Sequence, residues 1–313
     1  MKTLYILIVV SFILIFGFGC QQMPKEFKFE STAVAIGTII TLKAEGVNAQ
    51  VAIDESFRRI AALEETIDVD IAKIEDSVGS ADFVQVSQDT YEILRTAQNY
   101  SQLTNGAFDV TIGAAVELWN IGGNNQRVPS DEEIEAVKPL VGYNHLHLRD
   151  EDHSARLDLK GVKIDLGDLA KGYAVDLARQ IYVDNGITDG LIDFGTSTIY
   201  AFGSKRIALK DPRQLDKLTK VIKVNDSAIS TSGDYIKYFI IDDRRYHHIL
   251  DPRTCKPAQS GVSSVSVVID GSDEHCAMTA DILSTAVFVD PIFRVPNTEF
   301  IIIEDKEQGS KDK

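Results

Sequence analysis

Strand and turn patterns fill one continuous stretch of this sequence, residues 203–269, and helical patterns lie mostly outside it. Apolar residues recur at helical spacing in four longer segments, and a shorter helix is indicated within residues 128–142. Because helices and mostly antiparallel strands separate along the chain, the pattern predicts an α+β fold with mixed, mostly antiparallel sheets flanked by helices. The four longer helical segments are residues 50–66, 86–104, 168–186 and 275–289.

Capping residues and short strand patterns add detail to this outline. Ser87 and Ser130 precede two of the helical segments, where a hydroxyl oxygen can accept a hydrogen bond from a free backbone N–H. Asn105-Gly106 is a stop signal for the helix that follows Ser87. Further strands are expected at residues 30–46 (as a pair), 145–150, 155–167, 188–195 and 297–305.

The N-terminal residues 1–20 have the features of a lipoprotein signal peptide. Lys2 precedes an apolar run, residues 4–19, that is shorter than a membrane-spanning helix needs and ends at Cys20. The arrangement resembles a bacterial lipoprotein cleavage site, and the alternative is a plain membrane anchor with an incidental cysteine. We expect an extracytoplasmic protein, lipid-anchored through Cys20 to the periplasmic face of a bacterial inner membrane. Residues 21–29 are expected to form a tether, residues 30–305 the folded domain and residues 306–313 a flexible tail.

The charge balance limits the classes of ligand. The chain has 313 residues and a formal net charge of −15, which argues against non-specific nucleic-acid binding. An anionic ligand would need a local cation or a positive helix end. Two cysteines remain after Cys20, namely Cys255 and Cys276, and the sequence leaves open whether they form a disulfide.

Two segments have the chemistry of a phosphate or metal site. Residues 164–176 (IDLGDLAKGYAVD) indicate a strand that ends at Asp165, a glycine turn and a helix start with Lys171. Such a start offers free N–H groups to a phosphate, although an ordinary turn with a solvated lysine explains the pattern equally well. In residues 278–288, Asp281 and Thr285 share one helical face and offer hard oxygen ligands for Mg²⁺. Alternatively, Asp281 caps or pairs with another group and Thr285 bonds back to a helix carbonyl.

Three further segments combine polar and turn residues. In residues 105–119, Phe108-Asp109 follows a turn, where the pair is expected either to hold a ring system or to be a buried aromatic beside a capping acid. Residues 230–235 (STSGDY) are expected to form a tight turn, either rich in donors for a ligand or a plain surface turn. In residues 247–255 (HHILDPRTC), two histidines precede a rigid Asp-Pro turn.

Taken together and in this order, the five segments resemble the signatures of the FAD:protein FMN transferase (ApbE) family. The resemblance covers about residues 30–290 and implies an ApbE-like α+β fold that binds FAD between the two halves of the chain. The matching residues are Gly106–Asp109, Asp165–Asp176, Ser232–Tyr235, His248–Thr254 and Ala280–Ala286.

The resemblance also implies roles for individual residues. Mg²⁺ would be held by Asp281, Thr285 and the backbone carbonyl of Asp168, and it would bridge the pyrophosphate of FAD. His248 would be the general base, a role that suits imidazole because its pKa lies near neutral pH, and His247 would be a supporting or exposed neighbour. The residues expected to contact FAD are Ile36, Ala107, Phe108, Asp109, Asp165, Lys171, Ser232 and Ile249.

By this resemblance, the expected function is Mg²⁺-dependent transfer of FMN from FAD to a threonine of an exported acceptor protein, with release of AMP. The same base and metal would serve water as the acceptor, which would make the protein a FAD pyrophosphatase. A third interpretation is that the protein is a lipoprotein that binds flavin without catalysing a reaction.

Several positions differ from the family signatures. Ile36 replaces a methionine, Thr196 and Cys255 replace glycines, and residues 66–76 replace a serine- and tyrosine-containing loop. Asp168 stands where relatives have a small residue, and it either adds a carboxylate to the metal site or repels the pyrophosphate.

Overall fold

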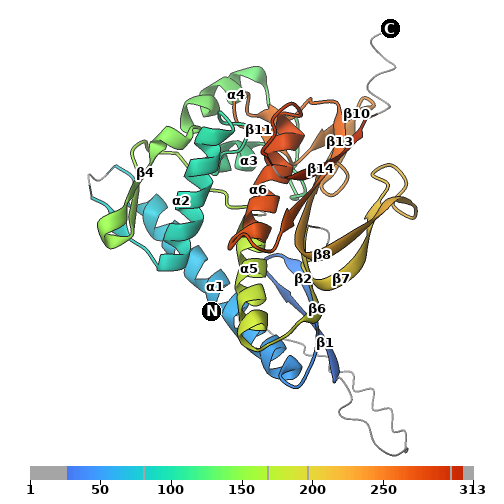
Figure 1. Cartoon of the computed structure of the whole chain (residues 1–313). Coiled ribbons are helices and arrows are strands. Elements are labelled where there is room, and N and C mark those ends of the chain that lie inside the picture. Colours follow the sequence, from blue (N-terminus) through green and yellow to red (C-terminus); the bar gives the residue numbers. More distant parts are fainter. Residues whose placement is uncertain (1–26, 80–81, 168, 196, 297, 306–313) are drawn as a thin grey trace, which may run out of the picture.

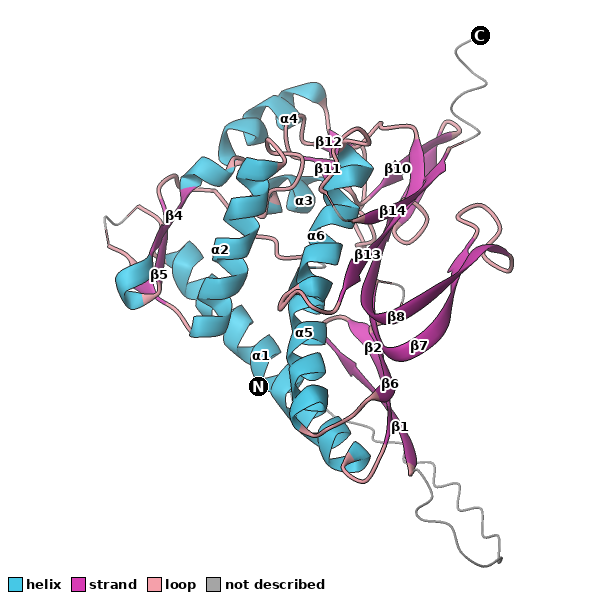
Figure 2. Ribbon diagram, in the orientation of Figure 1, coloured by secondary structure: helices cyan, strands magenta, loops and turns pink. Residues whose placement is uncertain are grey.

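The fold consists of helices packed on one face of a large twisted sheet (Figures 1 and 2). The computed structural model describes residues 27–79, 82–167, 169–195, 197–296 and 298–305. Helices and strands form separate layers, so the predicted α+β class is confirmed. The signal peptide and the tail lie outside the described residues, and the division of the chain into signal, tether, domain and tail stays a prediction.

The large sheet has seven strands in the order β1-β2-β6-β7-β8-β13-β14. Each strand is antiparallel to its neighbours. This order places β8 between β7 and β13 and brings the middle of the chain beside its C-terminal part. The strands are β1 (Lys28–Ala35), β2 (Thr38–Glu45), β6 (Asp189–Asp193), β7 (Thr198–Lys210), β8 (Leu218–Gly233), β13 (Val262–Asp270) and β14 (Glu299–Glu304).

Three helices cover one face of this sheet: α1 (Ala49–Asp76), α5 (Leu169–Asp184) and α6 (Cys276–Val289). In α6, every residue except Thr285 is buried, because the helix lies between α5 and the strands β8 and β13. A helix that is apolar nearly all round is expected in such a position. The main apolar core forms where these helices meet β2 and β6.

Shorter elements build a second region beside α1 (Figure 1). Ser87 caps α2 (Gln88–Leu103) by accepting from Thr90 N at 3.1 Å, and Ser130 caps α4 (Asp131–Val137) with Glu133 in a capping box. Both predicted caps are confirmed. The remaining elements are β3 (Val84–Gln85), α3 (Gly113–Trp119), η1 (Lys138–Leu140), η2 (Tyr143–His145), β4 (Leu146–Arg149), η3 (Asp150–Asp152), β5 (Ser154–Leu157), β9 (Tyr238–Ile241), β10 (Arg244–His247), β11 (Leu250–Asp251) and β12 (Lys256–Pro257).

Two sequence expectations about secondary structure were wrong. The helix expected to end at residue 66 continues to Asp76, so residues 66–76 are helix rather than loop. Its buried stripe includes Asp70, which accepts a hydrogen bond from Ser87 N at 2.8 Å, and this buried acid interrupts the apolar pattern. The strand expected at residues 155–167 ends at Leu157, and Asp165 lies in an irregular segment.

The hairpin of β7 and β8 extends well beyond the neighbouring strands. A β-bulge interrupts its register between Ala201 and Ser204, where Gly203 has φ +65°. Beyond the bulge, one side of the hairpin packs its apolar residues against the sheet, and the other side faces solvent. The packed residues are Ile207, Leu209, Ile222 and Val224, in one cluster with Leu191, Ala201, Ile229, Val268 and Ile301.

The two described cysteines are free and buried. Cys255 lies in an apolar cluster with Trp119 and Leu250, whereas Cys276 belongs to the main core. The possible disulfide between them is therefore absent from this structure. Within residues 27–305, apart from the five undescribed positions there, no helix is long and apolar enough to cross a membrane.

Candidate functional site

A buried carboxylate on α6 faces the end of β7 and β8. Asp281 is 3% exposed, and its Oδ1 accepts a hydrogen bond from Thr198 Oγ1 at 2.6 Å. The Ser230 hydroxyl donates to the same oxygen, and Ser197 Oγ lies 3.5 Å from it. These hydroxyl groups offset part of the cost of burying a charge in the core.

Thr285 extends the polar face of α6 by one turn. Its Oγ1 lies 3.0 Å from Ser232 Oγ, which also lies 2.7 Å from Ser284 Oγ. Ser230 and Ser232 are two residues apart on β8, so both side chains point at α6. Residues 230–233 therefore complete a strand, and the expected tight turn at 230–235 is limited to Asp234-Tyr235.

The start of α5 lies directly against Asp281. A Cβ atom on Gly172 would lie 2.9 Å from Asp281 Oδ2 and 2.8 Å from the Ala277 carbonyl oxygen. Only a glycine allows this approach, because a side chain here would overlap α6. The contact places the start of α5, which carries Lys171, beside Asp281. A joint phosphate and metal site of the two segments stays a prediction. Asp168 lies outside the described residues.

Two hydrogen bonds hold the loop before α5. Asp165 N donates to the Val110 carbonyl at 2.7 Å, and Asp165 Oδ1 accepts from Gly167 N at 2.7 Å. Gly167 has φ +48°, a conformation that glycine adopts without strain. Because Val110 follows Asp109, these contacts place the 107–109 turn beside the loop at 165–167.

A pocket of about 580 Å³ opens beside this loop. Ile36, Asp165 and Gly167 are among its lining residues, together with apolar residues of α1. Ile36 has φ +47° in the turn between β1 and β2, and its N–H donates to Glu64 Oε1 at 3.0 Å. A β-branched residue is strained at positive φ, and such strain persists where surrounding structure holds it. The volume is in the range of small-molecule sites. The charged lining residues are Glu64, Asp68, Glu75, Glu117, Lys163 and Asp165.

The 107–109 turn meets α6 through its apolar side. Ala107 and Ile249 share one buried cluster with Ala280 and Leu283 of α6. Phe108 packs against the edge of the main core. Asp109 is buried, and burial raises the pKa of its carboxyl, while hydrogen bonds from Thr111 N (2.8 Å) and Thr111 Oγ1 (2.7 Å) oppose this shift. Asp109 thus stabilises the turn before α3, but it does not cap this helix, whose N-cap Ile112 has no side-chain hydrogen bond.

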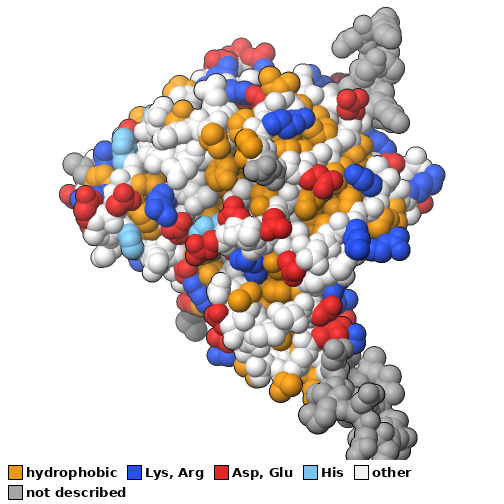
Figure 3. All heavy atoms as spheres, viewed as in Figure 1, with side chains coloured by type: hydrophobic (Ala, Val, Ile, Leu, Met, Phe, Trp, Pro, Cys, Tyr) orange, Lys and Arg blue, Asp and Glu red, His pale blue; other side chains and the backbone are white. Residues whose placement is uncertain are grey.

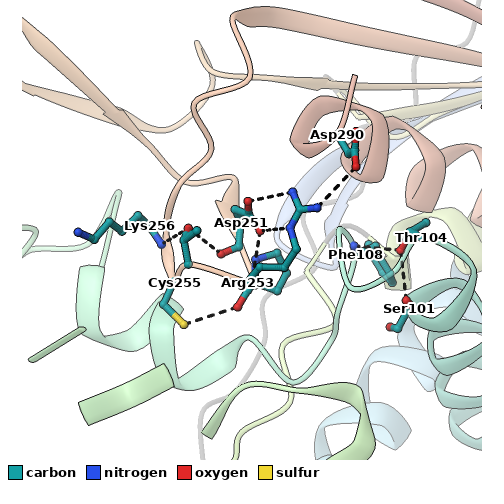
Figure 4. A network of polar contacts seen from close by, with 10 residues as sticks. Ser101, Thr104, Phe108, Asp251, Arg253, Cys255, Lys256 and Asp290 are labelled. Carbon is teal, nitrogen blue, oxygen red and sulfur yellow. Dashed lines mark hydrogen bonds and ion pairs between the residues drawn. The ribbon is translucent and has the colours of Figure 1, made fainter. Parts of the chain in front are cut away.

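The Asp-Pro turn after His248 is fixed by an ion-pair network (Figure 4). Arg253 donates to both carboxylate oxygens of Asp251, at 2.9 and 3.0 Å, and lies 3.5 Å from Asp290 at the end of α6. The same view shows Phe108 on another turn, where its N–H donates to Thr104 Oγ1 at 3.2 Å. Trp119 Nε1 also donates to the Cys255 carbonyl at 2.8 Å. The segment 251–255 is therefore tied to both α6 and α3.

The two adjacent histidines have different environments. His248 is half-buried, and its N and Nδ1 lie 3.1 and 3.2 Å from the Lys237 carbonyl oxygen. His247 is 6% exposed and packs edge-on against the Phe288 ring. Its Nε2 donates to the Ala258 carbonyl at 3.0 Å, and within the described part of the chain its Nδ1 has no hydrogen-bond partner. His247 is thus a buried residue whose contacts hold the segment that carries His248 in place.

We expect acid to destabilise the protein through His247. Burial lowers the pKa of this imidazole from 6.5 to about 4. Between these values the unfolded chain binds a proton that the folded protein does not, so the free energy of unfolding falls as pH falls through this range. The loss reaches about 3 kcal/mol. Urea unfolding across this range should show a shallower pH dependence for His247→Gln than for the unaltered protein, and equal slopes would contradict the assignment.

The described donors fit a hard divalent cation. Asp281 supplies a carboxylate, and Thr285, Ser230 and Ser232 supply hydroxyl oxygens near it, a donor set suited to Mg²⁺ and unsuited to a soft metal. Among the described residues, no group of three or more histidine, cysteine or acidic side chains is placed to hold a metal. A cation here would rely on hydroxyl, backbone and substrate oxygens besides Asp281, as Mg²⁺ commonly does.

Three residues of this site had no individual role in the sequence analysis: Thr198, and Asp176 and Ser230, which lie within the segments 164–176 and 230–235. Asp176 is 5% exposed and accepts hydrogen bonds from Ala277 N (3.0 Å) and Met278 N (2.9 Å), so it caps α6 from α5. Burial raises the pKa of Asp176 to about 7, against the lowering effect of these bonds. The capping residue lies 100 positions before the helix start, so no local pattern could reveal it.

Comparisons with known proteins identify the family of this chain. The model of the ApbE family matches residues 36–297. Proteins named FAD:protein FMN transferase from Treponema pallidum and Vibrio cholerae are 29% and 31% identical; each alignment covers 87% of this chain and 81% or 83% of the relative.

Solved structures give the same result. The ApbE protein of Thermotoga maritima superimposes with a TM-score of 0.75 at 35% identity, covering 84% of this chain and 87% of that protein. The flavin transferase ApbE of Vibrio cholerae gives 0.74 at 27% identity, covering 89% and 94%. The predicted family is therefore confirmed, and this chain belongs to the ApbE family.

Proposed function

We propose that this protein transfers FMN from FAD to a threonine hydroxyl of a partner protein, with Mg²⁺, and releases AMP. The threonine oxygen would bond to the phosphorus of the FMN half, and the bond from that phosphorus to the bridging oxygen would break. The threonine proton would pass to a base, and the bridging oxygen would leave with AMP. The relatives named FAD:protein FMN transferase support this reaction class.

One structural observation carries the proposal. Asp281 of α6 lies against Gly172 at the start of α5, where Lys171 and the loop at 165–167 are expected to contact the phosphates, and Thr285 lies one turn further along α6. A carboxylate, hydroxyls and a helix start thus converge on one place, and oxygen ligands beside free N–H groups suit a cation with a pyrophosphate. Bound Mg²⁺ would neutralise charge on the pyrophosphate and on the leaving AMP.

His248 is suited to accept the threonine proton. A carbonyl oxygen only accepts hydrogen bonds, so its contact with the Lys237 carbonyl requires the proton on Nδ1. In this tautomer Nε2 has the lone pair and can act as the base. The anchored neighbour His247 and the Asp251–Arg253 network hold this segment in place.

The residues expected to contact FAD form two groups around α6 and α5. Ala107, Phe108, Asp109 and Ile249 lie on the side of the Asp-Pro turn, and Ile36 and Asp165 line the pocket beside the loop. The pocket lining has five acids and one lysine. An anionic dinucleotide would therefore depend on Lys171 and on a metal ion for its phosphates.

A transfer assay tests the proposal. The full chain is incubated with FAD, Mg²⁺ and a threonine-containing flavin-acceptor domain, and the products are followed by in-gel fluorescence and by chromatography of AMP and FMN. The same domain with valine at the threonine is the control. Covalent flavin on the threonine domain alone, abolished by a chelator, supports transfer. AMP with free FMN and no labelled protein would show a pyrophosphatase, and tight FAD binding without products would show a flavin carrier.

We also propose that the mature protein is lipid-anchored at an extracytoplasmic membrane face. The support is the sequence of residues 1–20, with Cys20 at the end of the apolar run. Fractionation of cells that express the full chain tests this, since recovery in the soluble cytoplasm would exclude it.

A further inference from the structure

The solvent-facing side of the β7–β8 hairpin is strongly basic in an acidic protein. Residues 204–225, here named the basic arm, contain seven lysines and arginines and two aspartates, a net charge of +5 within a chain of −15. Figure 3 shows blue side chains gathered over the part of the surface where Figure 1 labels β7 and β8. Such a concentration of one charge creates a local field opposite to that of the whole protein.

Four of the seven positive side chains are exposed and form no ion pair in the described structure, whereas Lys205, Arg213 and Lys220 pair with acids. Arg206 and Lys223 lie directly opposite each other in the ladder, a like-charge pair that costs stability. Both are exposed, as are Lys210 and Lys217. Among the described residues, no ion pair joins these four cations to an acid. In contrast, Lys205 pairs with Asp189 at 2.8 Å.

Exposed apolar side chains accompany these charges. Val221, Leu218 and Leu215 are 44%, 58% and 52% exposed, and Val221 is in register with Ala208, one step along the face from the Arg206–Lys223 pair. A surface that combines cations with apolar groups matches a partner that combines acids with apolar groups.

The basic arm is joined to the candidate site by buried contacts. Arg213 in its turn donates to both oxygens of Asp234 at 2.7 Å and lies 2.9 Å from Asp305. Asp234 lies two residues after Ser232, the residue that contacts Thr285. Arg245 on β10 lies 3.4 Å from the Asp234 carbonyl, and β10 ends one residue before His248. The turn of the arm is therefore connected, through Asp234 and Arg245, to the strand that leads to His248.

We propose that the basic arm is the docking surface for the acceptor protein, and that it recognises an acidic, partly apolar segment near the threonine that receives FMN. This inference rests on the proposed function, because a docking surface for an acceptor presupposes a protein acceptor. The connection of the arm's turn to Asp234 and β10 favours an acceptor over a lipid surface, since a partner held on this side of the site can present a hydroxyl for transfer.

Charge reversal on the arm tests the proposal. The probes are a synthetic peptide with one threonine flanked by aspartates and leucines, and its matched form with asparagine at every aspartate. We expect the unaltered protein to bind the aspartate peptide about tenfold more tightly, with a preference that weakens as salt rises. The double variant Arg206→Glu/Lys223→Glu should lose this preference and raise the KM for the aspartate peptide about tenfold, with FAD affinity unchanged.

The matched control is Arg58→Glu/Lys160→Glu, which changes the net charge equally at two exposed positions outside the arm. This control should bind both peptides as the unaltered protein does. Charged side chains on a strand also prevent unwanted pairing with other strands, and this is an alternative role for the lysines. Glutamates would keep this protection, so this role alone predicts unchanged peptide binding in the arm variant. Unchanged peptide binding in the arm variant would overturn the proposal.

Two further outcomes are distinguishable. Arm-dependent sedimentation with phosphatidylglycerol vesicles, without binding of either peptide, would overturn the proposal in favour of a membrane surface. Arm-dependent peptide binding without FMN on the threonine would support the docking surface and contradict the proposed function. FMN transfer that is the same in the arm variant and the unaltered protein would support the proposed function and contradict the docking surface.

Discussion

Replacement of Asp281 by asparagine is expected to abolish metal-dependent turnover. Asparagine keeps the size of the side chain and an acceptor for Thr198 and Ser230, but it removes the buried negative charge that a divalent cation requires. A metal that neutralises phosphoryl charge contributes several kcal/mol, so the loss should be on the order of 10³-fold in kcat.

Metal binding separates this explanation from a folding defect. Calorimetric titration of Mn²⁺ into the protein with ADP present should show one site in the unaltered protein and none in Asp281→Asn, while circular dichroism stays the same. Asp273→Asn is the control, because this aspartate precedes α6 and lies outside the site. Full turnover in Asp281→Asn would remove the metal assignment.

Replacement of His248 by alanine is expected to lower kcat while FAD affinity stays the same. A positioned general base contributes about 10²–10⁴-fold, and that is the expected loss. The imidazole lies on the segment between β10 and β11, held by the Lys237 carbonyl, and its removal leaves the Asp251–Arg253 network and the buried His247 in place. The structure should therefore be preserved.

The pH profile distinguishes a base from a structural residue. The ascending limb of kcat, present in the unaltered protein, should disappear in His248→Ala, because the group whose deprotonation it reports is gone. His147→Ala on β4 is the control, since that histidine pairs with Asp158 away from α6. An unchanged rate and profile in His248→Ala would show that another group accepts the proton.

Local patterns in the sequence were sufficient for most helices and strands. The caps at Ser87 and Ser130, the helix that became α6 and the pair β1–β2 follow from neighbouring residues, because capping and side-chain periodicity act over a few positions. The end of α1 was misplaced because buried Asp70 is paired through a distant backbone N–H, which a local pattern does not contain.

The candidate site was predictable only as separate pieces. Asp281 and Thr285, four residues apart, could be placed on one helical face by spacing. Their hydroxyl neighbours could not, because Thr198 and Ser230 lie on strands whose pairing depends on register over long separations. The assignment of FAD and Mg²⁺ came from resemblance to a family, and spacing alone left the alternatives open.

By itself, the sequence determined the fold class, the family and the identity of the groups that carry chemistry. The tertiary structure decided which of them meet. Gly172 permits α5 to approach Asp281, Asp176 caps α6 across 100 positions, and the turn of the basic arm reaches Asp234. The physical reason is that burial and close packing bring together residues that are far apart in the chain. The free energy of these contacts depends on neighbours that no local segment contains.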